Sequence, residues 1–504
     1  MPHQYIKKIL ASRVYEAAVE TPLDEATNLS ARLQNRVLLK REDLQPVFSF
    51  KIRGAYNKLA QLSDDERARG VICASAGNHA QGLAMAASVM GVKAVIVMPR
   101  PTPEIKVNAV KARGGQVVLH GDTFDEALAY ALQQVDEKGY VFVHPYDDPY
   151  TIAGQGTIGM EILRQESGPI HSIFIPVGGG GLAAGIAVYI KYLYPDVRVI
   201  AVESEESACL KAAMDAGERV KLPQVGIFAD GIAVAQIGEH TFDLCRKYVD
   251  EVITVSTDEI CAAIKDVFTD TRSIPEPAGA ASIAGMKKYV ERENIEGETL
   301  IGIVSGANMN FSRLRYVAER TDLGEKTEAL LAVKLPERPG SFREFCLTLG
   351  KRAVTEFNYR YADSNTAHVF AGISLGKHGE GKEELLQNLR EKDFEVVDLS
   401  DDEMAKLHIR YMIGGQASGV TNEELFRFEF PEKPGALLRF LNQFGDRFNV
   451  SMFHYRNHGA AEARILVGLQ IDPEQRDEAR KAMDELGYPY WEESDNQAYK
   501  LFLR

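Results

Sequence analysis

The chain has 504 residues, of which 45% are hydrophobic and 26% are charged, enough for two to four folded domains. Its formal net charge of −14 argues against non-specific binding to nucleic acid or to an anionic membrane surface. It has no apolar run of about 18 residues, and residues 1–10 lack a signal-peptide core, so we expect no membrane partner.

Short apolar runs alternate with amphipathic stretches from about residue 35 to residue 320. We expect strands at residues 37–39, 70–74, 94–98, 116–119, 172–177, 197–202 and 300–304, and helices at residues 53–61, 80–90, 105–113, 124–138 and 182–193. Near-continuous apolar strands are typical of parallel sheets buried on both faces. The alternation of strands and helices therefore predicts an α/β fold.

The pattern changes after about residue 316, and we interpret the polar residues 320–326 as a linker. An internal repeat follows. The sequence PERPG at 336–340 recurs as PEKPG at 431–435, FNYR at 357–360 recurs as FHYR at 453–456, and Gly372 is matched by Gly468. Each copy is predicted to be a ferredoxin-like βαββαβ unit. Such a duplicated module indicates added regulation; the alternative is an oligomer interface.

The cysteines are scattered and form no CxxC spacing: Cys73, Cys209, Cys245, Cys261 and Cys346. Reduced thiols in a reducing compartment are the simplest interpretation. We therefore expect a cytoplasmic protein without a metal site.

Lys51 follows a loop that contains Pro46, and it opens an amphipathic helix. A helix N-terminus disfavours the protonated form of an amine and so helps it to react with a carbonyl group. A solvated surface lysine is the more common fate of this residue type, so Lys51 is not decisive by itself.

A second candidate site is the loop formed by Ser75, Ala76, Gly77, Asn78 and His79, which follows a predicted strand and opens a helix. Its small residues leave backbone N–H groups free to bind an anion such as a substrate carboxylate. Asn78 can donate to a phenolate oxygen. An ordinary helix cap is the alternative, and His79 alone is more typical of a structural residue.

A third candidate site is a run of four glycines between a strand and a helix: Gly178, Gly179, Gly180 and Gly181, followed by Leu182. Backbone without side chains can wrap a phosphate at a helix N-terminus. The same loop also matches the dinucleotide fingerprint, with Ala183 in the third position and Glu203 at the end of the next strand. An NAD-dependent oxidoreductase is therefore an alternative.

Ser305 lies at the end of the last predicted strand, where α/β sheets bind ligands. Its hydroxyl can hydrogen-bond a pyridine nitrogen without protonating it fully. A serine in an ordinary turn is the alternative interpretation.

Taken together, the segments SFK at 49–51, SAGNH at 75–79, the four glycines and SGAN at 305–308 resemble the motifs of fold type II pyridoxal-phosphate (PLP) enzymes. Their order and spacing, with the tandem repeat, are most similar to those of biosynthetic threonine dehydratases. This resemblance implies two α/β subdomains with parallel sheets, followed by two ferredoxin-like, ACT-like α+β modules. We expect the boundaries 1–320 for the catalytic domain, 328–400 for the first regulatory domain and 423–504 for the second.

The resemblance also implies roles for the candidate residues. Lys51 would hold PLP and act as acid and base, Asn78 would contact the ring hydroxyl, and Ser305 would meet the ring nitrogen. The phosphate would bind Gly178, Gly179, Gly180, Gly181 and Leu182, and the substrate carboxylate would bind the loop 75–79. The implied activity is deamination of L-threonine, and also of L-serine, by a homotetramer in isoleucine biosynthesis.

In the resembled family, isoleucine inhibits and valine antagonises the inhibition. We expect these effectors to contact Tyr359, Arg360, Leu437, Leu441, Tyr455 and Arg456. Serine racemases of this fold carry a second serine where this chain has Ala76, so elimination is favoured over racemisation. An amino-acid sensor with an inactive catalytic body, a threonine synthase and a cysteine synthase are the remaining alternatives.

Overall fold

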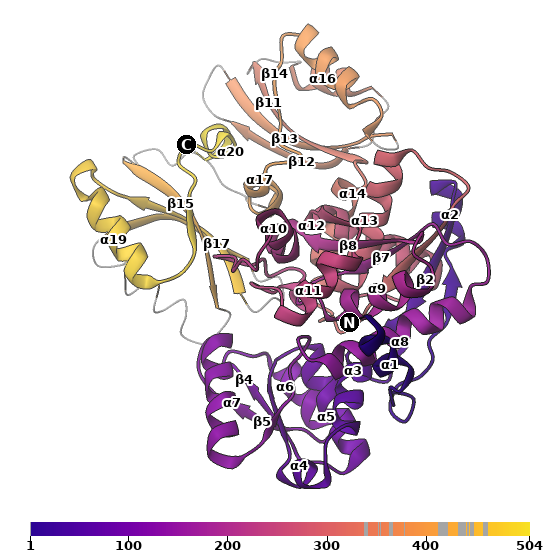
Figure 1. Cartoon of the computed structure of the whole chain (residues 1–504). Helices are drawn as coiled ribbons and strands as arrows, with labels where there is room; N and C mark the ends of the chain where they lie inside the picture. The colour runs from indigo at the N-terminus through magenta and orange to yellow at the C-terminus, as the bar shows by residue number, and fades with distance from the viewer. Residues whose placement is uncertain are drawn as a thin grey trace. The chain divides into compact units, whose positions relative to one another are not determined.

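The structure is a computed structural model that describes residues 2–336, 341–350, 352, 354–361, 366–376, 379–411, 422–431, 440, 443, 448–456 and 462–503. It separates into two compact units, Met1–Phe311 and Ser312–Arg504. Each unit has its own sheets (Figure 1).

The first unit contains two sheets. The larger has the order β1-β2-β10-β7-β8-β9, with strands Leu23–Glu25, Arg36–Arg41, Thr299–Val304, Ser172–Pro176, Arg198–Ser204 and Glu251–Val255. The smaller has the order β5-β4-β3-β6, with strands Gln116–Leu119, Ala94–Met98, Val71–Ala74 and Val141–Phe142. Every strand pair is parallel except β1 with β2. The predicted α/β fold with parallel sheets is therefore confirmed.

Helices cover both faces of these sheets. They are α1 (Pro2–Leu10), α2 (Thr27–Leu33), η1 (Glu42–Leu44), α3 (Lys51–Ala60), α4 (Asp64–Arg69), α5 (Asn78–Met90), α6 (Glu104–Lys111), α7 (Phe124–Lys138), α8 (Pro149–Gln165), α9 (Gly181–Leu193), η2 (Glu205–Ser207), α10 (Cys209–Ala216), η3 (Asp230–Ile232), α11 (Glu239–Tyr248), α12 (Thr257–Thr271) and α13 (Pro277–Glu293).

Alternating side chains of the strands explain this layering. In β3, Val71 and Cys73 pack in the cluster that contains α5, whereas Ile72 and Ala74 pack in the cluster that contains α7. Figure 1 accordingly shows α5 and α7 on either side of β4 and β5. Burial on both faces is the reason that these strands are apolar without interruption.

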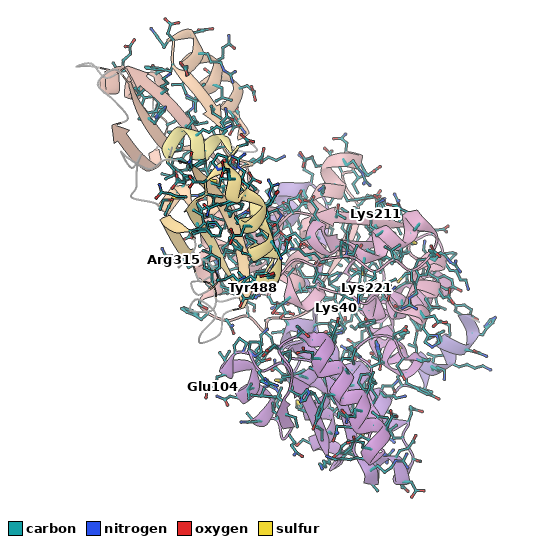
Figure 2. The ribbon with its side chains drawn as sticks, turned by 90° about the vertical axis from the view of Figure 1, so that its left-hand side faces the viewer. Lys40, Glu104, Lys211, Lys221, Arg315 and Tyr488 are labelled. Carbon is teal, nitrogen blue, oxygen red and sulfur yellow. The ribbon has the colours of Figure 1, made fainter. Side chains whose placement is uncertain are left out.

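A fully buried ionic cluster joins α3 to β2 and α8. Lys40 Nζ lies 2.6 Å from Glu161, and Arg53 lies 2.7 Å from Glu42 and 2.5 Å from Glu161. All four side chains have no exposed surface; Lys40 is labelled in Figure 2. Two positive and two negative groups balance one another, so the cluster fixes the helix that begins at Lys51 without a net buried charge.

The second unit contains two four-stranded antiparallel sheets. The first has the order β12-β13-β11-β14 and the second the order β16-β17-β15-β18. Leu330 pairs with Gly372 in the first copy, and Leu425 pairs with Gly468 in the second, so the repeat holds in register. The first copy has the predicted βαββαβ order. Of the first helix of the second copy, the structure describes only Phe440 and Gln443, and both Pro-Gly turns lie outside the described residues.

The elements of this unit are α14 (Arg313–Gly324), β11 (Glu328–Pro336), α15 (Ser341–Leu349), β12 (Val354–Tyr361), β13 (Thr366–Ser374), α16 (Lys382–Glu391), β14 (Glu395–Asp398), α17 (Glu403–Leu407), η5 (Ile409–Tyr411), β15 (Glu423–Pro431), β16 (Asn449–Arg456), β17 (Glu462–Gln470), η6 (Pro473–Gln475), α19 (Arg476–Leu486), β18 (Tyr490–Glu492) and α20 (Gln497–Phe502).

The predicted linker at residues 320–326 is wrong, because most of it belongs to α14. Arg320 is only 4% exposed; its guanidinium donates to Tyr316 Oη at 2.5 Å and pairs with Glu403 of α17. This polar segment can form a partly buried helix because the charge of Arg320 is paired with Glu403 inside the unit.

In the part of the chain that the structure describes, no helix is long and apolar enough to cross a membrane. The same residues contain no group of three or more His, Cys, Asp and Glu side chains suited to a metal ion. The side chains of Cys73, Cys209, Cys245 and Cys261 are buried.

Candidate active site

Lys51 is the first residue of α3, and its environment favours a neutral amine. Its Nζ donates to the carbonyl oxygen of Pro145 at 3.0 Å and lies 5.1 Å from the centre of the Phe50 ring. Burial lowers the pKa of Lys51 to about 8, while the charge of Glu276 acts in the opposite direction. The uncharged fraction of Lys51 near neutral pH is therefore far larger than that of an ordinary lysine, as a nucleophile or base requires.

The turn that precedes Lys51 is joined to the end of β10. Phe50 N donates to the carbonyl oxygen of Ser305 at 3.2 Å, and Ser49 forms an antiparallel bridge with Gly306. The Ser305 side chain is 3% exposed, and its Oγ lies 3.4 Å from the carbonyl oxygen of Ala278. Two of the residues predicted for the site are thus brought together from opposite ends of the first unit.

Close helix packing brings the loop 75–79 to the same place. A Cβ on Gly82 of α5 would lie 3.0 Å from the carbonyl carbon of Lys51, so α5 and α3 touch through their backbones. Ser75 Oγ accepts from Gly77 N at 3.3 Å, and a Cβ on Gly77 would meet no atom within 4 Å. Half-buried Ala76 lies between them. The loop therefore leaves open space in front of the first N–H groups of α5, which suits an anion.

His79 has a structural environment. It is buried, and its Nε2 lies 2.9 Å from the carbonyl oxygen of Val143. Burial, assisted by the charge of Lys51, lowers the pKa of His79 to about 3. The imidazole is neutral at physiological pH, so its contribution is to hold the loop rather than to carry charge.

The glycine run lies between β7 and α9, as predicted. Gly180 has a φ of +88°, which favours glycine, and Leu182 is buried in the first turn of α9. Thr241 Oγ1 donates to the Gly179 carbonyl oxygen at 2.7 Å. Among the described hydrogen bonds, none has the N–H group of Gly178, Gly179 or Gly180 as its donor. These N–H groups remain available for a phosphate.

A loop that the sequence interpretation overlooked brackets the glycine run. The Tyr146 ring would lie 2.2 Å from a Cβ on Gly179, so the two pack face to backbone. Asp147 accepts from Glu239 N at 2.8 Å and Thr241 N at 3.2 Å at the start of α11. Because Pro145 in the same loop accepts from Lys51, this loop links the lysine to the glycine run. The polar sequence HPYDD at 144–148 was its signal.

Two further side chains had no role assigned from the sequence: Glu276 was missed, and Asn308 stood only as part of the motif at 305–308. Glu276, 3% exposed, accepts from Asn78 Nδ2 at 2.6 Å, and Asn308 Nδ2 donates to Asn78 Oδ1 at 2.7 Å. Both lie far from Asn78 in the chain, so no local spacing could link them. The signal for Glu276 was an acidic residue between two prolines, Pro275 and Pro277, at a helix start.

The structure disagrees with a dinucleotide site at the same loop. Glu203 is fully buried and accepts from Leu210 N and Lys211 N, both at 2.8 Å, at the start of α10; Lys211 is labelled in Figure 2. Burial raises the pKa of Glu203 to about 7, against the effect of those N–H groups. Because the Glu203 carboxylate is buried and already accepts from two backbone N–H groups, it cannot bind a ribose. The NAD alternative is therefore set aside.

The expected effector residues are only partly described. Tyr359 and Arg360 lie on β12, opposite Val369 and His368, and Tyr455 and Arg456 lie at the equivalent places on β16, opposite Ile465 and Arg464. Leu437 and Leu441 lie outside the described residues.

Comparison with known proteins places this geometry in a family. Residues 14–306 match the family described as pyridoxal-phosphate dependent enzyme, and residues 319–409 and 414–503 match the C-terminal regulatory domain of threonine dehydratase. The chain is 56% identical over 504 residues to the L-threonine dehydratase biosynthetic IlvA of Burkholderia multivorans, with 99% of each chain covered. The chain belongs to the biosynthetic threonine dehydratases.

Other relatives agree. The chain is 54% identical to the Escherichia coli L-threonine dehydratase biosynthetic IlvA, with 99% of this chain and 97% of that one covered. The processed form of threonine deaminase isoform 2 from Solanum lycopersicum is similar with a TM-score of 0.62 and 50% identity, over 63% of this chain and 93% of that chain. Like the rest of its family, this threonine dehydratase homologue is a PLP-dependent lyase with a regulatory domain.

The residues present fit PLP. The site offers a lysine with a lowered pKa, free N–H groups at a helix start, an amide and a buried hydroxyl. In addition, Ser49 Oγ is buried and has no hydrogen-bond partner among the described residues. An orphaned polar atom beside Lys51 is the state expected of a group that faces a ligand.

Proposed function

We propose that this chain converts L-threonine to 2-oxobutanoate and ammonia in the first step of isoleucine biosynthesis, and that it also accepts L-serine. The observation that carries the proposal is the convergence of three distant segments: the Lys51 turn, the Ser305 strand end and the Asn78 helix start. The names of the relatives at 56% and 54% identity support threonine as the substrate.

We assign PLP to four segments of this site. Lys51 would hold it covalently, Asn78 would donate to its phenolic oxygen, and Ser305 would meet its ring nitrogen. The N–H groups of Gly178, Gly179, Gly180, Gly181 and Leu182 would bind its phosphate. When bound, PLP supplies an electron sink for the electrons released when the Cα–H bond of an amino acid breaks.

The protein's own groups would then orient the substrate and move its protons. The N-terminus of α5, with Ser75 and Gly77, would hold the substrate carboxylate. The neutral amine of Lys51 would accept the Cα proton, because its pKa of about 8 lies near physiological pH. Pro145 O, which accepts from Nζ at 3.0 Å, would keep the amine oriented. Ala76 carries no hydroxyl to return a proton from the opposite face, so elimination is favoured over racemisation.

The regulatory unit would bind amino-acid effectors, with isoleucine as inhibitor and valine as antagonist. The duplicated sheets and the match to a regulatory-domain family support a small-molecule effector. We propose contacts at Tyr359, Arg360, Leu437, Leu441, Tyr455 and Arg456, a homotetrameric assembly and a cytoplasmic location. Inhibition would require isoleucine to bind one state of the assembly more tightly than the other.

The Lys51 assignment is tested by absorbance. The full chain with PLP should show the visible band of the lysine-bound cofactor, and Lys51→Ala should lose it together with all turnover. Lys93→Ala removes an exposed lysine of the same unit and should change neither. A band that persists in Lys51→Ala would place the covalent link at another lysine.

A further inference from the structure

Glu276 is a buried acidic residue that no step of the proposed reaction uses. It directly precedes α13, but its carboxylate makes no capping hydrogen bond to that helix. It accepts instead from Asn78 Nδ2 at 2.6 Å, and only 3% of the residue is exposed. The free energy cost of burying a carboxylate is large, so its place beside Asn78 calls for a reason.

The amide of Asn78 is held at both ends. Asn308 Nδ2 donates to Asn78 Oδ1 at 2.7 Å and to the Val47 carbonyl oxygen at 2.8 Å, which uses both of its hydrogens. Asn78 Nδ2 uses one hydrogen on Glu276 and retains one. With acceptor and donor sides both fixed, the direction of the remaining hydrogen is set by Asn308 and Glu276.

The surroundings of the Glu276 carboxylate exclude alternative positions. A Cβ on Gly306 would lie 2.6 Å from Glu276 Oε1, and a Cβ on Gly231 would lie 3.3 Å from it. The backbone N–H of Glu276 donates to the carbonyl oxygen of Gly306 at 3.0 Å. The acidic side chain is therefore enclosed between two glycine backbones beside the end of β10, where electrostatic effects are strong.

Glu276 also supplies the charge that acts on Lys51. The titratable groups that face this lysine are His79 from α5, His144 from the loop before α8 and Glu276 from the start of α13. Burial lowers the pKa of both histidines, so they are neutral at pH 7. The negative charge near Lys51 at this pH is therefore that of Glu276.

We propose that Glu276 is a positioning residue of the cofactor site: it fixes the Asn78 amide with one hydrogen left for the phenolic oxygen of PLP, and it places a protein negative charge near Lys51. The inference rests on the proposed attachment of PLP to Lys51. The Glu276 side chain makes two contributions: a hydrogen bond to Asn78 and a negative charge beside Lys51. Two different substitutions can remove these contributions one at a time.

The test uses the full chain with PLP and the variants Glu276→Gln and Glu276→Asp. Two quantities are measured: the affinity for PLP, and the pH midpoint of the visible absorbance of the bound cofactor. Glutamine keeps an oxygen acceptor for Asn78 but removes the charge, so PLP should stay bound while the midpoint falls by about one pH unit or more. Aspartate keeps the charge but is shorter, so the midpoint should hold while the affinity falls about tenfold.

Glu104→Gln, which removes an exposed carboxylate at the start of α6, is the control and should change neither quantity (Figure 2). A Glu276→Gln midpoint equal to that of the parent chain would overturn the inference. If that variant fails to fold by circular dichroism, Glu276→Asp decides, and unchanged affinity overturns it. If Lys51→Ala instead kept the visible band, the proposed attachment of PLP to Lys51 would be overturned, and this inference with it.

Discussion

The backbone N–H of Phe50 donates to the carbonyl oxygen of Ser305 at 3.2 Å. This hydrogen bond joins the turn that carries Lys51 to the strand end that carries the hydroxyl proposed for the ring nitrogen of PLP. The lysine and the serine are therefore held at a fixed separation by main chain, which does not depend on side-chain rotamers. A cofactor that touches both would bind to a site that is already formed.

The pH dependence of PLP capture follows from the state of Lys51. The neutral amine reacts with the aldehyde, and burial lowers the pKa of Lys51 from 10.5 to about 8. As pH rises through this value the amine loses its proton, so the rate of PLP capture by the apoprotein should rise and reach half its maximum near pH 8. Stopped-flow absorbance measures it. A half-maximum near the ordinary value of 10.5 would contradict the buried site.

Gly77→Ala should separate substrate binding from folding. The new Cβ meets no protein atom within 4 Å, so the free energy of unfolding should change by no more than about 0.5 kcal/mol. The same space is proposed for the substrate carboxylate, so KM for L-threonine should rise about tenfold or more while PLP stays bound. An unchanged KM would show that the carboxylate binds elsewhere.

Gly179→Ala should damage the phosphate loop. Its Cβ would lie 2.2 Å from the Tyr146 ring, so the loop or the ring must move, at a cost of about 1–3 kcal/mol in stability and with weaker PLP binding. Gly159→Ala in α8 is the matched control. Its Cβ would sit 3.5 Å from the nearest atom, and alanine favours a helix interior, so stability should be kept or gained. Equal PLP affinity in the two variants would contradict the phosphate assignment.

Tyr499→Phe should weaken the regulatory unit. The Tyr499 hydroxyl donates to Glu423 Oε2 at 2.6 Å, and the side chain is fully buried, so its loss leaves a carboxylate oxygen short of a donor. We expect the free energy of unfolding of this unit to fall by about 1–2 kcal/mol. Scanning calorimetry would show this as a lower transition temperature. Lys500→Ala, also in α20, removes an exposed ion pair with Asp495, which precedes the helix, and should have almost no effect. A transition temperature of Tyr499→Phe equal to that of the parent chain would show that this hydrogen bond does not stabilise the unit.

The sequence predicted the parts of the fold that are governed by local periodicity. The strands at 94–98 and 116–119 and the helix at 124–138 have the predicted bounds, because apolar spacing and flanking turns are local signals. The prediction that residues 320–326 form a linker was wrong, because the pairing of Arg320 with Glu403 depends on a helix more than eighty positions away. Long helices such as α8 and α13 were not predicted at all.

The same distinction holds for the site. Lys51, Asn78 and Ser305 follow strands or open helices, positions that a sequence reveals, and the structure brings them together. Glu276 and the Tyr146 loop act through contacts across the fold, which no spacing encodes. Their discovery required the positions of the side chains that press against Gly179 and Gly306.

The most direct test of the central claim is the initial rate of 2-oxobutanoate formation from L-threonine by the full chain with PLP, measured across threonine concentration with and without L-isoleucine. Turnover should occur, and it should fall or depend sigmoidally on threonine concentration when isoleucine is present. Turnover that ignores isoleucine would keep the chemistry and return the tandem repeat to a structural role. The absence of turnover with PLP bound would contradict the proposed function.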